Sequence, residues 1–353
     1  MTDAPNVLAR RLTAQLLAGR PAGSPVAVAE RLLAIQGQDP RAARLAVRAR
    51  SAGVSSGDID RALTEERSLV ITTLNRGTLH LVRSEDYPLL QSLTTPPLMT
   101  ASATRLAQDG LDPATTARAV DWIDRSIQRE GPLTRAQLRE HLERAGIPNL
   151  QHSLVHLIFR ASIEGRIVRG PMIGRQHAFV RVGDWLSPAP PPPREVALAE
   201  LARRYLAGHG PATDRDLARW AGLPLRDARA GLSAIAGELR EHPGGLVDLR
   251  RRGRAARLPE PRLLGAFEPL LLGWCSRADV LGAGDARVVT GGVFRNFALA
   301  GGRAVAVWRL NGSAVELEPF APLDDDTLSA LARDGEAVIR FLRQKTDATN
   351  ATV

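Results

Sequence analysis

Two glutamines and an aspartate stand close together near the N-terminus, in the segment Gln36-Gly37-Gln38-Asp39-Pro40. Glutamine amides carry strong dipoles, so they can orient a water molecule or stabilise a developing positive charge while staying neutral themselves. Asp39 is the nearest carboxylate and can support them by orienting the same water. Together these residues suit hydrolysis of a bond whose leaving group is already activated, because such a reaction needs no strong general acid.

The same segment is also typical of a helix start. Asp39 would then be the N-cap and Pro40 the first helical residue. Gln36 and Gln38 would merely satisfy backbone groups of the preceding loop. The residues alone leave both interpretations open.

A second group of candidates lies about forty residues further along the chain. His80 falls in the alternating segment 78–82, where Leu79 and Leu81 face the opposite side of the expected strand. His80 can therefore point toward the same site and contact substrate or phosphate, or it can be a structural histidine. Arg76, in the turn before this strand, can bind a phosphate or simply be solvated.

Metal, redox and nucleotide-cofactor chemistry find no support in the residue pattern. His152 and His156 are four positions apart, but the glutamate of a metalloprotease helix is missing between them. The single cysteine, Cys275, excludes an intramolecular disulfide and a cysteine-rich zinc site. With no phosphate loop, dinucleotide fingerprint or nucleophile elbow either, we expect no metal and no cofactor.

Charge points to a nucleic-acid partner. Lysine and arginine total 47 against 38 acidic residues, giving a net charge of +9, and Lys345 is the only lysine. Such an excess attracts phosphate backbones, although the preference for arginine also fits a GC-rich genome. Aromatic residues make up only 4% of the chain, so we expect binding to double-stranded DNA and not base stacking on single strands. The arginines expected to contact DNA, besides Arg76, are Arg160, Arg166, Arg169, Arg175, Arg250, Arg251, Arg252 and Arg254.

The chain contains no long apolar run and no N-terminal pattern of a secretory leader. We therefore expect a cytoplasmic protein without membrane contact, associated with the nucleoid through its DNA. A monomer is the expected state.

An internal repeat indicates the fold. Residues 131–148 and 210–224 both begin with Gly-Pro and a threonine, and both end in Ala-Gly-(Ile/Leu)-Pro. Each copy predicts a helix capped by its threonine, then a second amphipathic helix, then two short strands. This order is that of a winged-helix unit, which lays its second helix in a DNA groove.

The N-terminal third can be interpreted in the same way, and the C-terminal part alternates as strands do, for example at 285–290 and 303–310, before a closing helix at 325–342. The sequence therefore predicts an α+β fold of three tandem winged-helix units with a C-terminal β-rich cap. The expected boundaries are 1–95 for unit 1, 96–187 for unit 2, 188–194 for a proline linker, 195–260 for unit 3, 261–345 for the cap and 346–353 for a tail.

Several segments, in this order, resemble the tandem winged-helix superfamily that includes the AlkZ-like bacterial alkylpurine DNA glycosylases. The resemblance extends over about residues 5 to 345 and is carried by 33–40, 75–82, 263–269, 293–295 and 307–309. In the characterised glycosylases of this superfamily the catalytic element is Gln-x-Gln or Gln-x-Asp, which implies a catalytic role for Gln36 and Gln38. The middle residue is usually apolar, and Gly37 departs from that pattern in a way expected to loosen the motif.

The resemblance implies a monofunctional glycosylase that hydrolyses the N-glycosidic bond of N7- or N3-alkylated purines, for repair or for self-resistance to a genotoxin. Lesions as large as genotoxin adducts or crosslinks are among the possible substrates. A lyase step is not expected, because Lys345 lies near the C-terminus and no other lysine amine is present. The alternative is a non-catalytic winged-helix DNA-binding protein, such as a transcriptional regulator.

Overall fold

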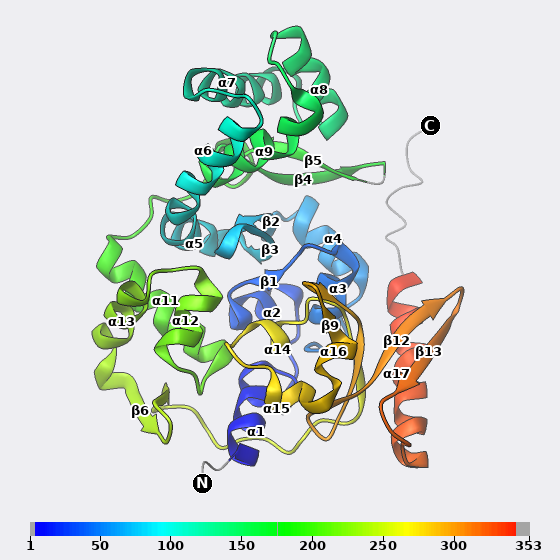
Figure 1. Cartoon of the computed structure of the whole chain (residues 1–353). Helices are drawn as coiled ribbons and strands as arrows, with labels where there is room; N and C mark the ends of the chain where they lie inside the picture. Colours follow the sequence, from blue (N-terminus) through cyan, green and yellow to red (C-terminus); the bar gives the residue numbers. More distant parts are fainter. Residues whose placement is uncertain (1–3, 175, 344–353) are drawn as a thin grey trace.

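The computed structural model describes residues 4–174 and 176–343, which form a large body and a smaller helical lobe beside it (Figure 1). The N-terminal elements are α1 (Ala4–Ala14), α2 (Pro25–Leu32), β1 (Ile35–Gln36), α3 (Pro40–Arg48), α4 (Ser56–Thr64), β2 (Leu69–Leu74), the short helix η1 (Asn75–Gly77), β3 (Thr78–Arg83) and α5 (Tyr87–Thr94). The next elements are α6 (Met99–Gln108), α7 (Pro113–Glu130), α8 (Arg135–Arg144), α9 (Leu150–Ile163), β4 (Ile167–Ile173), β5 (Gln176–Arg181) and α10 (Val182–Trp185).

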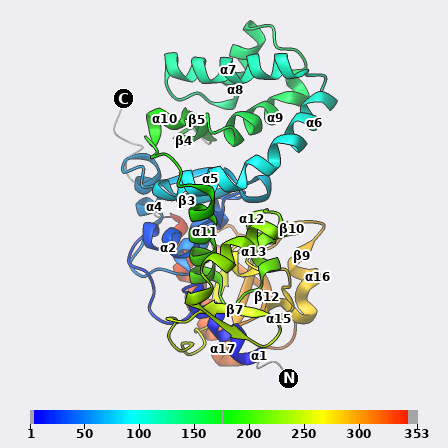
Figure 2. The same cartoon turned by 90° about the vertical axis from the view of Figure 1, so that its left-hand side faces the viewer.

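After the exposed prolines 188–193, the chain re-enters the body (Figure 2). Its elements there are α11 (Arg194–His209), α12 (Asp214–Ala221), α13 (Leu225–Ala234), β6 (Leu239–His242) and β7 (Leu246–Leu249). The C-terminal part contains β8 (Arg262–Leu264), α14 (Pro269–Leu272), α15 (Ala278–Leu281), α16 (Asp285–Val288), β9 (Val289–Thr290), β10 (Val293–Phe294), β11 (Phe297–Ala300), β12 (Arg303–Asn311), β13 (Ala314–Pro319) and α17 (Asp325–Arg343).

Both copies of the internal repeat begin with the cap that the sequence predicts. Thr134 and Thr213 each accept a hydrogen bond from a backbone N–H three residues on, and Gln137 and Asp216 bond back to them. These reciprocal capping boxes satisfy donors that a helix start otherwise leaves unpaired. Each copy then continues with a second helix and a hairpin, β4–β5 or β6–β7.

The first two hairpins are joined into one sheet. Its strand order is β1-β3-β2-β4-β5, and Ile71 of β2 pairs with Arg169 of β4. Alternate residues face opposite sides: Val70 and Val82 pack in one hydrophobic core, whereas Leu69 and Leu81 pack in another. Residues 1–95 and 96–187 therefore share a sheet whose faces are both covered.

The helices α6 to α9 form the lobe and pack around a core of their own, to which Ile167 and Phe179 contribute from the sheet (Figures 1 and 2). In the body, by contrast, the N-terminal elements share their cores with the third unit and the C-terminal part. The C-terminal sheet has the order β13-β12-β11-β8, and α17 packs against it.

The strand expected at residues 285–290 is wrong for its first four residues. Residues 285–288 form the helix α16, and only Val289 and Thr290 are extended. Asp285 lies in the first turn of that helix, where a negative charge is favourable, and Val288 is fully buried. The burial of Val288 in the folded protein thus outweighs the strand-like alternation of residues 285–288.

Close packing between α2 and α11 generates a stability prediction. A methyl group on Gly208 would strike the backbone carbonyl of Arg31, which cannot move as a flexible side chain can. We expect Gly208→Ala to lower the free energy of unfolding by about 1–3 kcal/mol, as measured by urea denaturation. The control is Gly335→Ala in α17, whose new methyl would lie an ordinary 3.4 Å from Val315, and which should raise stability by about 0.5–1 kcal/mol. Equal effects of the two changes would contradict the packing argument.

Candidate active site

The glutamine pair lies at the edge of the five-stranded sheet. Gln36 forms β1 with Ile35 and is directly opposite His80 of β3. The Gly37 N–H donates to the carbonyl of Leu79 (2.7 Å), and the Gln38 side-chain oxygen accepts from the Leu79 N–H (3.3 Å). These two bonds attach the segment to β3 on both sides of Leu79, so the flexibility that glycine brings at position 37 is offset by pairing.

The two glutamines differ in surroundings. Gln36 is 9% exposed, and its amide has no hydrogen-bond partner within the described part of the chain. Gln38 is exposed and uses its oxygen on the strand. Gln36 is therefore the amide free to orient a water molecule, and Gln38 both lines the site and helps to fix it.

Both glutamines open into a cavity of about 440 Å³. Its lining combines amides, guanidinium groups, aromatic rings and leucines, which come from β1, η1, β3, α12, α14, β10 and the segments between them. The lining residues are Gln36, Gln38, Arg76, Thr78, Arg219, Phe267, Leu271, Leu272, Trp274, Arg277, Gly292 and Phe294. No carboxylate is among them. The cavity can accept a flat, apolar group beside neutral amides while presenting cations to a neighbouring anion.

His80, the strand partner of Gln36, is buried in its neutral form. It is 3% exposed, and its Nδ1–H donates to the Thr78 carbonyl at 2.9 Å. Burial, together with the nearby charge of Arg76, lowers the pKa of His80 to about 3. Gln36, His80 and Thr72 are paired across three neighbouring strands, so they form a neutral polar row on one face of the sheet.

Asp39 is the N-cap of α3, and its carboxylate accepts from the Arg41 N–H at 2.8 Å. The helix-start interpretation of Asp39 and Pro40 is thereby confirmed, since Pro40 is the first helical residue. Asp39 lines a different hollow, of about 770 Å³, in which Trp308 and Arg309 also lie. Phe294 lines both hollows, whereas Asp39 is not among the described residues that line the glutamine cavity.

Arg76 uses its guanidinium within the protein. Its Nη1 donates to the carbonyls of Trp220 (2.5 Å) and Arg219 (3.2 Å), at the C-terminal end of α12. Such carbonyls attract a cation because they lack helical partners. Arg76 thus joins the turn before β3 to the third unit while still lining the cavity.

The other arginines expected at a DNA surface are placed in several ways. Arg160 pairs with Glu164, Arg166 with Asp121 at 3.5 Å, and Arg169 stacks over the ring of Phe179. Burial lowers the pKa of Arg169 to about 10. Arg250 donates to the Leu239 carbonyl, Arg252 pairs with Asp248, and Arg251 and Arg254 are exposed. Arg175 lies outside the described residues. The described members of this group do not line the glutamine cavity.

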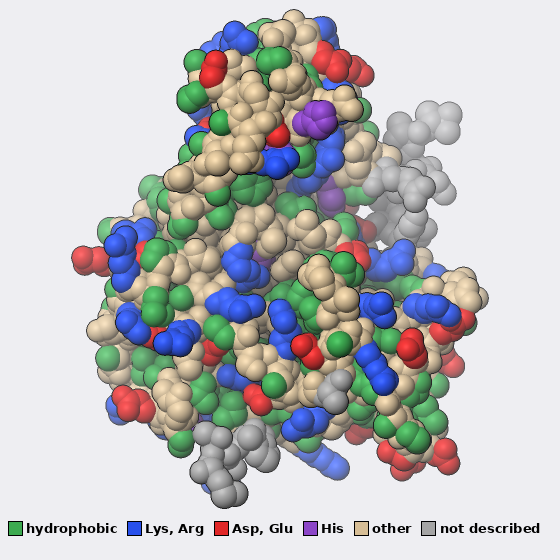
Figure 3. Space-filling view, viewed as in Figure 1, with side chains coloured by type: hydrophobic (Ala, Val, Ile, Leu, Met, Phe, Trp, Pro, Cys, Tyr) green, Lys and Arg blue, Asp and Glu red, His purple; other side chains and the backbone are tan. Residues whose placement is uncertain are grey.

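Two arginines that do line the cavity escaped the sequence analysis. Arg219 is exposed in the last turn of α12. Arg277 donates from Nε to the Leu271 carbonyl at 3.1 Å, and its guanidinium lies 5.2 Å from the ring centroid of Phe294. Figure 3 shows a group of basic side chains near the centre of this face, over the region of α12 and α14. Arg219 and Arg277 come from distant parts of the chain, so no local sequence motif indicates that they line one cavity.

The wall opposite the glutamines is fixed by buried polar contacts. Glu268 and Arg50 form an ion pair in which both side chains are fully buried, and the Ala266 N–H donates to the Asn296 side chain at 2.8 Å. Between these anchors Phe267 adopts φ +52°, a costly conformation for a residue with a side chain. Its ring lies 5.2 Å from that of Phe294, so the anchors hold an aromatic pair at the cavity.

None of the helices in 4–174 and 176–343 is long and apolar enough to cross a membrane. The same ranges contain no group of three or more histidine, cysteine, aspartate or glutamate side chains placed to hold a metal ion.

A neutral amide pair beside a cationic, aromatic cavity on a helix-and-sheet fold defines a candidate nucleic-acid-processing enzyme. A sequence model of the family described as "DNA glycosylase AlkZ-like" matches residues 29–341. The chain belongs to this family and is a DNA glycosylase. No curated protein sequence matches it.

Among solved structures, the fold is similar to that of Streptomyces sahachiroi DNA glycosylase AlkZ. The TM-score is 0.81 at 24% sequence identity, and the match covers 96% of each chain. This similarity establishes the shared mixed fold of helices and sheets.

The buried histidine generates a pH prediction. In the unfolded chain His80 takes up a proton below about pH 6.5, whereas the folded protein keeps it neutral to about pH 3. Its contribution to stability is therefore complete above pH 6.5 and is lost as the pH falls, by up to about 1.4 kcal/mol per unit. Urea denaturation at several pH values should show a shallower decline for His80→Gln than for the wild type. The exposed His152 supplies the control, His152→Gln; a parallel decline for all three proteins would refute a neutral His80.

Proposed function

We propose that this glycosylase releases N7- or N3-alkylated purines from double-stranded DNA, with Gln36 and Gln38 as its catalytic residues. The observation that carries the proposal is the amide of Gln36, which has no hydrogen-bond partner among the described residues and opens into a cavity whose described lining contains no carboxylate. Water orientation is then the main task left to the protein, because an alkylated purine already carries the positive charge that makes it a good leaving group.

In the proposed step a water oxygen bonds to the anomeric carbon while the N-glycosidic bond breaks. The bonding electron pair leaves with the purine and cancels its positive charge, and the water loses a proton to solvent. The amide oxygen of Gln36 orients the water. The Gln38 oxygen, which already accepts from the Leu79 N–H, uses its second lone pair on the same water, and both amides offset the positive charge that develops on the sugar. Neutral His80 holds Gln36 in register, and Asp39 acts only indirectly through the start of α3.

Weak catalytic groups also bring selectivity. An unmodified purine departs as an anion and needs protonation, which no lining residue is placed to supply. The adjoining hollow beyond Phe294 leaves room for larger substituents, which supports genotoxin adducts or crosslinks as further substrates and a role in repair or self-resistance.

We further propose that the repeated helix-helix-hairpin units are winged helices that hold the duplex, with the protein acting as a monomer on nucleoid DNA. The helix pairs α8–α9 and α12–α13, each followed by a hairpin, support this assignment. Arg219 and Arg277 would contact phosphates beside the lesion. The alternative of a non-catalytic regulator is disfavoured by membership of a glycosylase family.

Base release tests the catalytic assignment. We expect wild-type protein to release 7-methylguanine from methylated duplex DNA, and Gln36→Ala combined with Gln38→Ala to lower the rate by about 10²–10³-fold, in line with the loss of positioned electrostatic groups. Duplex affinity should persist. Gln128→Ala, which changes an exposed glutamine of α7, is the matched control. Full activity of the double variant would remove the glutamines from the mechanism; binding without release by the wild type would exclude 7-methylguanine as a substrate.

Salt dependence tests the phosphate contacts. Each phosphate neutralised by an arginine contributes about 0.9 to the slope of log affinity against log salt. Arg219→Ala and Arg277→Ala should each lower that slope by about this amount in fluorescence anisotropy with duplex DNA. Arg333→Ala, at an exposed position of α17, should leave it unchanged. Unaltered slopes in both cavity variants would show that the strand runs elsewhere.

A further inference from the structure

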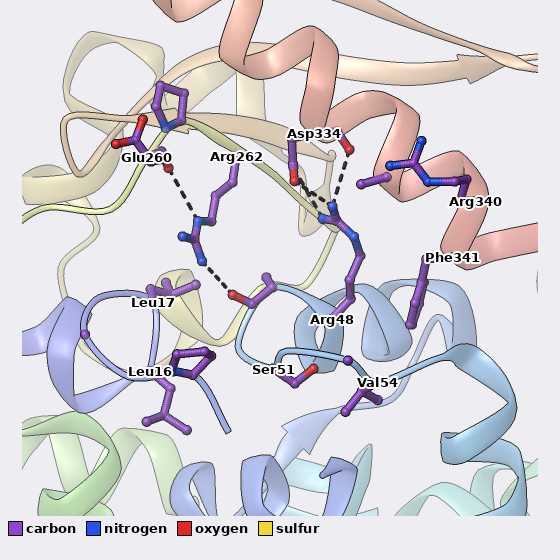
Figure 4. Close-up of a pocket in the computed structure, with 16 residues that line it drawn as sticks. Leu16, Leu17, Arg48, Ser51, Val54, Glu260, Arg262, Asp334, Arg340 and Phe341 are labelled. Atoms are coloured by element: carbon purple, nitrogen blue, oxygen red, sulfur yellow. Dashed lines mark hydrogen bonds and ion pairs between the residues drawn. The ribbon is translucent and has the colours of Figure 1, made fainter. Parts of the chain in front are cut away.

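A third hollow lies between the N-terminal helices and α17, apart from both hollows that adjoin the glutamine segment. It has a volume of about 490 Å³ and shares no lining residue with the glutamine cavity. Figure 4 shows Arg48 and Arg262 turned into it, with Leu17 at one border and Phe341 at another. Its position gives it no evident part in base excision.

The lining of this hollow carries more guanidinium groups than carboxylates. Asp334 is already used by Arg48, which donates to both of its carboxylate oxygens, and by the Leu263 N–H at 2.7 Å. Arg262 donates to the carbonyls of Ala49 (2.7 Å) and Glu260 (3.5 Å). No carboxylate of the described residues lies within ion-pair distance of Arg262. A partly buried cation held by carbonyls alone is costly.

The surroundings of Arg262 strengthen this imbalance. Burial is the largest cause that lowers its pKa, and the charges of Arg50 and Arg48 lower it further, whereas the carboxylates of Asp334 and Glu260 offset this only in part. Arg340, also at the hollow, is largely exposed and has Glu336 at 3.7 Å. An anion that enters the hollow would meet the guanidinium groups of Arg262 and Arg340. Of these two, Arg262 has no ion-pair partner among the described residues.

The rest of the lining combines polar groups, among them the carboxylate of Glu260, with an apolar part. The apolar part consists of Leu16, Leu17, Pro21, Val54, Pro261 and Phe341. A recess of this size, with apolar side chains beside charged groups, can hold a small molecule. A phosphate of duplex DNA would not use such walls, whereas an organic anion would bury its apolar part against them.

We propose that this hollow binds a small organic anion, with Arg262 bonding the anionic group and the walls around Leu17 and Phe341 holding an apolar body. The bound molecule would join α17 to the end of α3, the helix that begins directly after the glutamine segment. The proposal does not depend on the substrate of the glycosylase.

Phenyl phosphate is a suitable probe because it combines an anion with an apolar ring. Isothermal titration calorimetry on the full chain should show saturable binding, with weaker binding of inorganic phosphate and of phenol, each of which lacks one half. Arg262→Gln should weaken phenyl phosphate binding by about tenfold or more, equivalent to about 1.4 kcal/mol. Arg277→Gln, in the glutamine cavity, and Arg333→Gln, outside both hollows on α17, should retain it.

A second variant covers the case in which Arg262→Gln does not fold. Ala337→Glu adds a carboxylate to the lining and should weaken phenyl phosphate to a similar extent. Absence of saturable binding to the wild type in the millimolar range would overturn the proposal, as would unchanged affinity in either pocket variant. Loss of duplex affinity in Arg262→Gln with phenyl phosphate binding intact would assign this arginine to DNA and overturn it equally.

Discussion

The buried ion pair between Arg50 and Glu268 is the contact on which the site depends. Arg50 follows α3, the helix that starts at the glutamine segment, and Glu268 precedes α14, which forms the opposite wall. Arg50 also donates to Gln15 at 2.8 Å, so α1 is tied to the same point. Leaving either charge unpaired in this environment would cost about 3–5 kcal/mol. The two walls of the cavity would then no longer be fixed relative to each other.

The neutral character of the candidate site follows from the same architecture. Gln36 and His80 face the side of the sheet covered by one large apolar core, to which Val70 and Val82 belong. A charged side chain there would be strongly penalised, and the lowered pKa of His80 reflects this penalty. The cations sit instead at the rim, where phosphates would neutralise them. Without such neutralisation, guanidinium groups would oppose the positive charge that develops on the sugar.

The sequence predicted what depends on neighbours along the chain. The caps at Thr134 and Thr213, and the start of α3 at Asp39, rest on hydrogen bonds spanning two or three residues, which local residue types reveal. The order of helices and hairpins could be predicted for the same reason. At 285–288 the local alternation misled, because burial of Val288 decided the conformation.

Features that need distant segments could not be predicted. The union of the first two hairpins rests on pairing between Ile71 and Arg169, about a hundred residues apart. Arg219 and Arg277 line the same cavity as Gln36 only in the folded chain, in which α12 packs against η1. The candidate catalytic segment itself was recognisable from its residues, whereas the cavity that gives it a use was not.

The separate core of the lobe has a consequence for how the protein holds its substrate. Because α6 to α9 bury their apolar residues mainly against one another, this lobe can open or unfold locally with a free energy different from that of the body. A ligand that contacts both parts, as a duplex would, stabilises the less stable part by mass action. Bound DNA would then raise the free energy needed to open or unfold the lobe. The lobe would be more rigid in the complex than in the free protein.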